Sequence, residues 1–241
     1  MTASARDVVP AIEPVRLPIR GGGVFPVRRV YCVGRNFADH AREMGAQAPE
    51  SKAARGTPVF FAKPADAVVT AGDVPYPSAT QDLHHEVELV VALGADAPPG
   101  ELAVDAAQAL VFGYTIGLDL TRRDLQAAAK AKGLPWDVAK GFDASAPVGE
   151  LVPAGDVGPL APRTLSLEVN GERRQTSTLD QLIWDVPEIL HELSKLFALR
   201  AGDLVFMGTP AGVAALAPGD RCVARLDDVI ELHLQITPPS L

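Results

Sequence analysis

The chain has 241 residues, 47% of them hydrophobic, and a formal net charge of −8. This length fits one large domain, or one domain with a short appendage. The acidic balance, without a long lysine or arginine cluster, argues against a nucleic-acid-binding protein and favours a small molecule as the partner. No apolar run reaches the ~20 residues of a membrane span, and the first residues lack the apolar stretch of a signal peptide. Since Cys32 and Cys222 lie far apart, we expect a cytoplasmic protein with free thiols.

The first part of the chain predicts an arm followed by a strand-rich domain. Residues 1–25, with scattered prolines and a glycine run, are expected to form an N-terminal arm with one strand, and residues 26–241 a single domain. Apolar runs predict strands at 28–34, 58–62, 67–70, 86–93 and 110–118. Between them, residues 36–44 predict a short helical turn, and the small and polar residues 45–57 predict a mobile loop.

The second part of the chain adds helices, a hairpin and the closing strands. Thr121 and Asp124 resemble a capping box that opens a helix through about residue 132. Asn170-Gly171, after the strand 164–169, predicts a tight hairpin turn, and residues 182–199 carry apolar side chains at helical spacing. Further strands are expected at 204–207, 222–226 and 229–236. Many strands, few helices and no regular alternation between them predict a mainly β fold of the α+β class.

The stretch DLHHEVELVV, residues 82–91, places two glutamates at the start of a strand that is otherwise apolar. Glu86 and Glu88 are two residues apart, so on a strand they share one face. Two like charges on a buried face repel and raise each other's pKa, and a divalent cation would remove that cost. An exposed edge strand with two solvated glutamates explains this pair equally well.

Asp119 adds a third carboxylate, directly after the apolar run 110–118. Asp119 could instead cap the following helix, although Thr121 is already expected at the N-cap position. Three carboxylates without a committed cysteine or histidine suit a hard ion that prefers oxygen, such as Mg²⁺, Mn²⁺ or Ca²⁺.

A second interpretation of the same stretch uses its histidines. His84 shares the strand face of Glu86, and with His191 or His233 the two would form a two-histidine, one-carboxylate iron site, which implies an oxygenase. His191 lies within a helical pattern and His233 in a terminal strand, where histidines are more often structural.

Seven segments occur in an order that resembles the fumarylacetoacetate hydrolase family, on its acylpyruvase and fumarylpyruvate hydrolase side. They are VYCVGRNFADHAREMG, PVFFAKPADAVV, LHHEVELVVALG, GYTIGLDLTRRDLQ, KGLPWDVAKGFDASAPVG, LEVNGE and GDLVFMGTPAGV. The resemblance covers roughly residues 26–226. The final segment ARLDDVIELHLQI departs from it, because the family commonly has a glycine-containing turn near its last strands.

The resemblance implies a fold of mixed β-rolls packed face to face, usually in a homodimer. It also assigns one divalent cation per subunit, Mg²⁺ or Mn²⁺, to Glu86, Glu88 and Asp119. In that assignment His84 and His85 are not ligands.

The implied activity is hydrolysis of a carbon–carbon bond in an acylpyruvate, a 2,4-diketo acid, with fumarylpyruvate, split into fumarate and pyruvate, as the leading candidate. Water must attack the carbonyl at C4, and negative charge then develops on the pyruvate enolate. The resemblance assigns the base to His40 and Glu43, which lie three residues apart on one side of a helical turn. Without it, they read as an ordinary surface pair. The 45–57 loop is where a lid is expected.

The resemblance assigns further residues to the substrate. Lys140 matches a lysine that contacts the reacting ketone or enolate, and Arg123 and Gln126 match substrate contacts. Thr209, in a Gly/Pro turn, would hold a carboxylate, and Lys63 would lie near the site. Each has a plain alternative, as a surface lysine, a solvated helix residue or a simple turn.

Three other functions stay open. Oxaloacetate decarboxylation also ends in a pyruvate enolate, but it needs no activated water, so the His40–Glu43 pair favours hydrolysis. An iron oxygenase and a non-catalytic dicarboxylate-binding protein are the others. For a dianionic substrate, we expect Arg123, Lys52 or Arg55 to bind the second carboxylate.

Overall fold

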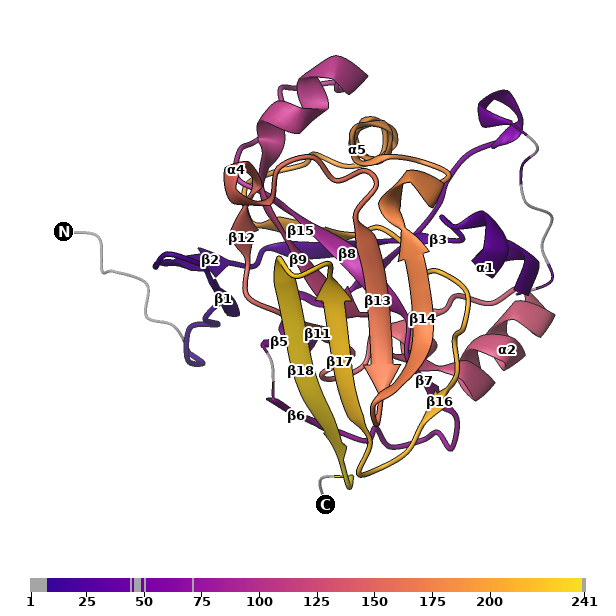
Figure 1. Ribbon diagram of the computed structural model, residues 1–241. Helices are drawn as coiled ribbons and strands as arrows, with labels where there is room; N and C mark the ends of the chain where they lie inside the picture. The colour runs from indigo at the N-terminus through magenta and orange to yellow at the C-terminus, as the bar shows by residue number, and fades with distance from the viewer. Residues whose placement is uncertain (1–7, 44, 46–48, 50, 71, 240–241) are drawn as a thin grey trace.

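Two β-sheets face each other across the main hydrophobic core (Figure 1). The computed structural model describes residues 8–43, 45, 49, 51–70 and 72–239. The eight-stranded sheet consists of β4 (Val59–Lys63), β3 (Arg29–Gly34), β15 (Asp203–Phe206), β8 (Val87–Leu93), β9 (Val111–Leu118), β11 (Ala146–Val148) and β5 (Val68–Thr70) in that order, with β12 (Val152–Pro153) paired to β9. The five-stranded sheet consists of β14 (Glu172–Thr178), β13 (Thr164–Val169), β17 (Arg221–Leu226), β18 (Ile230–Thr237) and β6 (Gly72–Pro75).

Small sheets and short helices complete the fold. The small sheets are β10 (Thr121–Arg122), β7 (Leu83–His84) and β16 (Ala215–Leu216), and the pair β1 (Arg16–Pro18) and β2 (Val24–Pro26). The α-helices are α1 (Ala38–Glu43), α2 (Arg123–Lys132), α3 (Asp137–Lys140), α4 (Ala154–Val157) and α5 (Val186–Ser194). The 3₁₀ helices are η1 (Lys52–Ala54), η2 (Ala65–Ala67), η3 (Val104–Leu110) and η4 (Leu179–Gln181). None of the helices described is both long and apolar enough to cross a membrane.

The strand-rich α+β fold is the predicted class, and the main predicted strands are present to within about two residues at their ends. β8 shows why its sequence is apolar throughout. Val87, Leu89 and Val91 face the core between the two large sheets, and Val90 faces the second core on the other side of the sheet. Because both faces of β8 are covered, an acidic side chain at its start is held inside the protein.

The N-terminal arm contains two strands where the sequence suggested one. β1 and β2 pair in antiparallel fashion, and Leu17 and Phe25 are buried in the second core. Gly21, at φ +86°, opens a run of glycines in the left-handed region that turns the chain between them. The arm therefore covers the outer face of the large sheet.

The predicted capping box at Thr121 is wrong. Thr121 lies in β10, and α2 begins at Arg123 without a side-chain cap. The Thr121 hydroxyl instead accepts a hydrogen bond from Lys140 Nζ at 2.7 Å and donates to the Asp119 carbonyl. A buried polar contact from a distant residue thus overrides the local helix signal.

The predicted helix 182–199 is shorter than its apolar pattern, because α5 spans only Val186–Ser194. Asp185 and Glu188 form a reciprocal capping box, and Pro187 lies in the first turn, where its missing N–H costs nothing. The helix therefore begins where the chain supplies a cap.

The predicted tight turn at Asn170-Gly171 is present, and the last hairpin of the five-stranded sheet turns without glycine. Asn170 and Gly171 have φ values of 54° and 82°, as a type I′ hairpin requires. The last hairpin uses Asp227 at φ 48° where the family commonly has glycine, and its carboxylate accepts a hydrogen bond from the Thr164 N–H at 2.8 Å. This side-chain bond stabilises a left-handed residue without glycine.

Candidate metal centre and active site

The pairing of β8 with β9 places three carboxylates together. Val87 is paired with Leu118 in antiparallel register, so the next residues outward, Glu86 and Asp119, lie opposite each other. The Asp119 N–H donates to the Glu86 carbonyl at 2.8 Å, which extends this register by one residue. Glu88 is paired with Gly117, where a Cβ atom would lie only 2.8 Å from the Phe206 ring and 2.9 Å from the Pro147 carbonyl oxygen. Single oxygens of the three acids lie within 4.8 Å of one another.

The three acids are buried and strongly coupled. Their exposed fractions are 6% for Glu86, 2% for Glu88 and 0% for Asp119. Burial, followed by the charges of Asp119 and Glu86, raises the pKa of Glu88 well above its usual value. Burial also opposes ionisation of Glu86, but Lys140 and Arg123 outweigh it, and the pKa of Glu86 lies well below its usual value.

The donor set fits a hard divalent cation. It offers carboxylate oxygens alone, the ligands that Mg²⁺ and Mn²⁺ prefer. Asp119 Oδ1 is buried and forms an ion pair with Lys63, whose Nζ lies 2.8 Å away. The ammonium is not aligned for a hydrogen bond, so this oxygen accepts none from the described residues. Glu86 and Asp119 are paired with cations, but Glu88 has no ion-pair partner among the described residues, so a cation beside it would offset its buried charge. In a six-coordinate ion, three protein oxygens leave positions for water or substrate.

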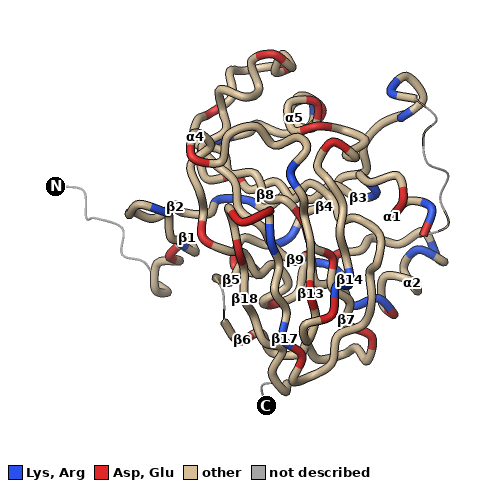
Figure 2. Tube along the Cα trace, in the orientation of Figure 1, with Lys and Arg blue, Asp and Glu red and all other residues tan. Residues whose placement is uncertain are grey.

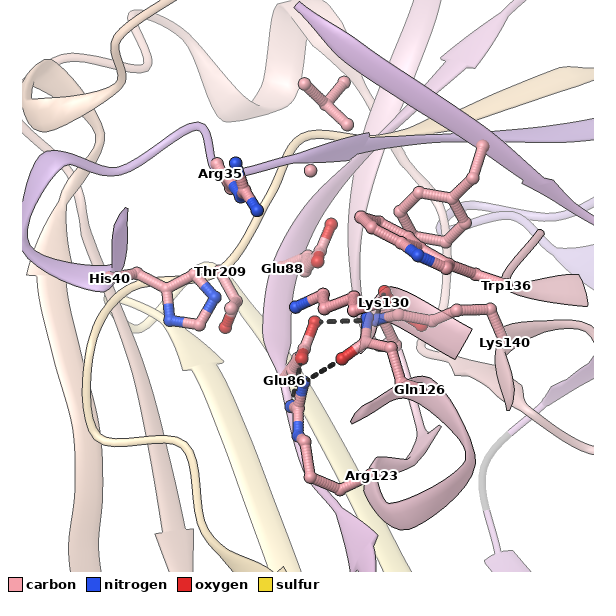
Figure 3. A pocket seen from close by; sticks show the side chains of 14 residues that line it. Arg35, His40, Glu86, Glu88, Arg123, Gln126, Lys130, Trp136, Lys140 and Thr209 are labelled. Atoms are coloured by element: carbon pink, nitrogen blue, oxygen red, sulfur yellow. Dashed lines mark hydrogen bonds and ion pairs between the residues drawn. The ribbon is translucent and has the colours of Figure 1, made fainter. Parts of the chain in front are cut away.

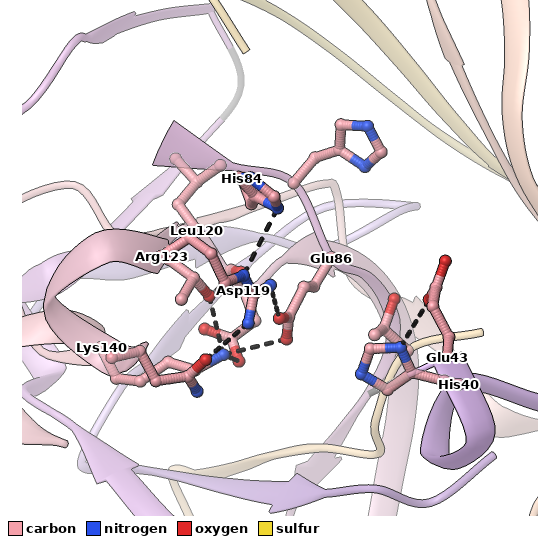
Figure 4. A network of polar contacts seen from close by, with 12 residues as sticks. His40, Glu43, His84, Glu86, Asp119, Leu120, Arg123 and Lys140 are labelled. Carbon is pink, nitrogen blue, oxygen red and sulfur yellow. Dashed lines mark hydrogen bonds and ion pairs between the residues drawn. The ribbon is translucent and has the colours of Figure 1, made fainter. Parts of the chain in front are cut away.

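Two buried lysines, Lys63 and Lys140, lie against the carboxylates, and Figure 4 shows the contacts of Lys140. Lys140 Nζ donates to Glu86 Oε2 at 2.9 Å, Asp119 Oδ2 at 2.6 Å and Thr121 Oγ1 at 2.7 Å. Burial favours the neutral amine, but Asp119 and Glu86 outweigh it and raise the pKa of Lys140. Lys63 Nζ donates to the carbonyls of Leu120 and Lys140. Both lysines are buried, so the alternative interpretation as surface lysines is wrong.

Arg123 and Gln126 extend this network from the first turn of α2. Arg123 pairs with Glu86 Oε1 and donates to Gln126 Oε1 at 2.5 Å. Its Nε lies 3.4 Å from His84 Nδ1, and His84 Nε2 lies 2.8 Å from Asp82. The guanidinium of Arg123 is therefore held on a metal-ligand candidate and is not free for a distal substrate group.

His40 lines the same cavity from the other side (Figure 3), and Glu43 contacts its ring (Figure 4). His40 Nδ1 lies 3.1 Å from Glu43 Oε2, and Glu43 Oε1 accepts the Gly212 N–H at 3.0 Å. Since a carboxylate only accepts, Nδ1 carries the hydrogen of this contact, and Nε2 is then the nitrogen with the lone pair in the neutral ring. In Figure 4 that second nitrogen faces Glu86 across the cavity. The dyad is thus oriented as a general base would need.

Thr209 lines the cavity from the loop after β15. Its hydroxyl accepts a hydrogen bond from Gln175 Nε2 at 2.8 Å, which leaves its hydrogen available to a ligand. Gln175, on β14, is 1% exposed, and its Oε1 accepts the Val87 N–H at 3.1 Å and lies 2.9 Å from His85 Nδ1. Gln175 therefore connects the start of β8 to Thr209. The sequence analysis missed Gln175, because the segment ERRQTST has the polar pattern of an edge strand.

Replacing Gln175 with leucine is expected to lower the free energy of unfolding by about 2–4 kcal/mol, because several buried polar groups lose a partner. Urea unfolding of the metal-free protein would measure this. The matched control is Gln181→Leu at an exposed position, expected to change stability by less than about 0.5 kcal/mol. Equal midpoints for the two variants would contradict the role of Gln175 in the fold.

The cavity has further cationic and aromatic walls that the sequence analysis missed: Arg35, Phe61, Lys130 and Trp136. Lys130 Nζ lies 5.2 Å from the centre of the Trp136 ring. The cavity itself is small, about 30 Å³, and a hollow of about 350 Å³ adjoins it across Phe61, Trp136 and Lys140. Arg35 lies in the segment GRN and Trp136 in the segment GLPW. Neither segment has a residue spacing that indicates a binding site.

Other predicted arrangements are not formed. Within the described residues, the cluster of Glu86, Glu88 and Asp119 is the only group of acids, histidines or cysteines that could hold a metal. His191 Nδ1 lies 2.7 Å from the Leu102 carbonyl, and His233 is paired with Glu231. The two-histidine iron site is therefore wrong for this structure.

The loop cations are likewise occupied. Arg55 donates to both oxygens of Glu188, at 2.8 and 2.9 Å, and Lys52 lies 3.3 Å from the same carboxylate. Burial opposes ionisation of Glu188, but its contacts with Arg55, the Asp185 N–H and Lys52 together outweigh it and lower the pKa of Glu188 to about 2. In this structure neither cation is free for a substrate, which corrects that prediction. Cys32 is a buried core residue, as expected.

Comparisons with known proteins agree on the family. Residues 29–237 match the family model described as fumarylacetoacetate (FAA) hydrolase C-terminal. A fumarylpyruvate hydrolase of Ralstonia sp. is 41% identical over 74% of this chain and 92% of its own. An oxaloacetate tautomerase of Escherichia coli K12 is 40% identical over 84% of this chain and 90% of its own. The crystal structure of fumarylpyruvate hydrolase from Pseudomonas aeruginosa in complex with Mn²⁺ and pyruvate superposes with a TM-score of 0.90 at 47% identity, over 97% of this chain and 100% of that one.

Proposed function

This chain belongs to the fumarylacetoacetate hydrolase family, and we propose that it hydrolyses the carbon–carbon bond of an acylpyruvate, with fumarylpyruvate as its substrate. The observation that carries this is one cavity lined by a buried carboxylate triad on one side and His40 on the other. The relatives named fumarylpyruvate hydrolase support the choice of substrate.

Glu86, Glu88 and Asp119 would hold one divalent cation, Mg²⁺ or Mn²⁺, which would polarise the 2-oxo acid and offset the negative charge that develops as the bond breaks. The Mn²⁺ in the Pseudomonas aeruginosa structure supports this ion type. Lys140 keeps a positive charge at the same place, because its partners Glu86 and Asp119 raise its pKa. The lysine thus adds a fixed cation where the enolate forms.

His40 takes the proton of the attacking water. Its Nε2 is the free ring nitrogen, and Glu43 holds the ring through Nδ1. The Gly212 N–H donates a hydrogen bond to Glu43, so the orientation of the His40 ring is set before substrate binds. The Thr209 hydroxyl, held by Gln175, can donate to the substrate carboxylate. Gln126 and Arg123 line the side next to Glu86.

Oxaloacetate tautomerisation or decarboxylation is the second candidate. The 40% identical Escherichia coli tautomerase favours it, and oxaloacetate presents the same 2-oxo acid end. Decarboxylation needs no activated water, so the oriented His40–Glu43 dyad favours hydrolysis. Tautomerisation moves a proton at C3 and would also use an acid–base group.

A substrate panel with Mg²⁺ and Mn²⁺ tests this function. We expect kcat/KM for fumarylpyruvate to exceed that for acetylpyruvate by about tenfold or more, because the fumaryl carboxylate adds a charge-assisted bond. Pyruvate release and loss of enol absorbance are the measurements. A clear preference for oxaloacetate would replace hydrolysis by the second candidate, and a preference for acetylpyruvate would overturn the substrate. The homodimer implied by the family resemblance stays a prediction.

A further inference from the structure

The cations first expected to bind a distal carboxylate are already occupied. Arg123 is paired with Glu86, and Arg55 and Lys52 are both on Glu188. Lys63 and Lys140 are likewise held on the carboxylate triad. A second acidic end of the substrate would therefore need a different partner.

Arg35 and Lys130 line the cavity from two separate elements, the loop after β3 and the last turn of α2. Within the described part of the chain, neither has a carboxylate partner within ion-pair distance. In Figure 3 both side chains extend toward the hollow between His40 and the Glu86–Glu88 pair. Two cations that have no ion-pair partner among the described residues thus converge on one place.

The backbone of Arg35 is held in an unfavourable conformation. Its φ is 60°, in the left-handed region that a long side chain rarely adopts. The buried neighbour Asn36 holds the chain there, because its side-chain amide donates to the carbonyls of Met207 at 2.7 Å and Trp184 at 3.0 Å. Its Oδ1 accepts the Trp184 N–H at 2.8 Å. Such over-determined strain is typical of functional positions.

Lys130 is half-buried, and its ammonium lies 5.2 Å from the Trp136 ring. Burial, together with the charges of Arg123 and Arg35, lowers the pKa of Lys130. The cavity is lined by four lysine and arginine side chains and three carboxylates, and an anion would offset the difference. The chain as a whole has a formal net charge of −8, and its acidic and basic residues are spread over the fold (Figure 2).

We propose that Arg35 and Lys130 bind the second carboxylate of a dianionic 2-oxo acid, while its first carboxylate lies at the triad end of the cavity. This rests on the proposed function, and it narrows the substrate class to acids charged at both ends. Charge supports it, because Lys63, Lys140 and Arg123 already match the three carboxylates of the triad. A divalent cation with Arg35 and Lys130 then leaves four positive charges, of which a dianion offsets two and a monoanion only one.

Kinetics of Arg35→Gln, Lys130→Gln and the double variant test the proposal. We expect kcat/KM for fumarylpyruvate to fall about tenfold for each single variant and about 100-fold for the double, mainly through KM. For acetylpyruvate, which has no distal charge, we expect less than about a threefold change. Arg35→Lys, which keeps the charge, should recover part of the loss. Equal losses on both substrates, or no loss on either, would overturn the proposal.

The matched controls are Arg42→Gln and Lys132→Gln, two exposed cations outside the cavity. Lys132 is two residues from Lys130 on the same helix, so it reports any general effect of charge on α2. Both controls should leave the ratio of the two kcat/KM values unchanged. A control that lowers the ratio as much as Arg35→Gln would assign the effect to net charge and overturn the site.

Binding separates this inference from the proposed function. Calorimetry on Mn²⁺-loaded protein compares 2-oxoheptanedioate with 2-oxoheptanoate, unreactive acids of equal length that differ only at the distal end. We expect the wild-type protein to bind the diacid about tenfold more tightly or better, and the double variant to lose this difference. That result supports the Arg35–Lys130 site even if no acylpyruvate is turned over. Equal binding of the two acids by the wild-type protein refutes the anchor even if acylpyruvates are hydrolysed.

Discussion

Glu88→Gln is expected to abolish binding of a divalent cation and to lower turnover by about 10³-fold or more, because the cation supplies several kcal/mol of charge stabilisation. Glu88 is the best of the three acids to replace. Glu86 and Asp119 are both bound to Lys140, so neutralising either leaves this buried cation with one charged partner instead of two. Glu88 instead accepts the Gly208 N–H at 2.7 Å, a bond that a glutamine oxygen can keep.

The stability of the metal-free variant distinguishes loss of the ion from loss of the fold. Burial and two neighbouring acids raise the pKa of Glu88, so its neutral replacement should leave the metal-free protein as stable as the wild type or more so. Mn²⁺ should then raise the Tm of the wild type and not that of Glu88→Gln. Exposed Glu172→Gln is the control for charge alone. Full activity of the wild type after exhaustive chelation would falsify the metal role.

The sequence predicted the two glutamates on one face because strand alternation is a local property. Val87 and Val90 do lie in different cores, as a period of two requires. The position of Asp119 relative to the two glutamates could not be predicted from local sequence. It faces Glu86 only because β8 and β9 pair in one register, and register depends on the whole sheet.

The residues that were missed or misjudged act through distant contacts. Thr121 looked like a helix cap, yet its hydroxyl bonds to Lys140, 19 residues along the chain. Gln175 sits among exposed polar residues, yet it bonds to the start of β8, 88 residues away. Arg35 lies in a loop, where no periodicity reports the direction of a side chain. The family resemblance supplied the dyad, because two polar residues three apart are common on any helix surface.

His40→Ala is expected to lower the rate of acylpyruvate hydrolysis by about 10²–10⁴-fold, the usual contribution of a general base. Its Nε2 faces the cavity, and no other histidine lines that cavity in the described residues. Fold and metal binding should persist, since His40 has no contact with the triad among the hydrogen bonds described. Mn²⁺ calorimetry and thermal unfolding would check both. His233→Ala, at an exposed position on β18, is the matched control.

The same variant separates the candidate reactions by their chemistry. Hydrolysis needs a proton removed from water, and tautomerisation needs a proton moved at C3, so both should fall together in His40→Ala. Decarboxylation of oxaloacetate breaks its bond without either transfer, and it should retain most of the wild-type rate. Glu43→Gln should show a weaker form of this pattern, because it keeps a side-chain oxygen near Nδ1 while removing the charge. Equal loss of hydrolysis and decarboxylation in His40→Ala would show that the histidine acts on the shared 2-oxo acid end, and the assignment of the dyad to water would be wrong.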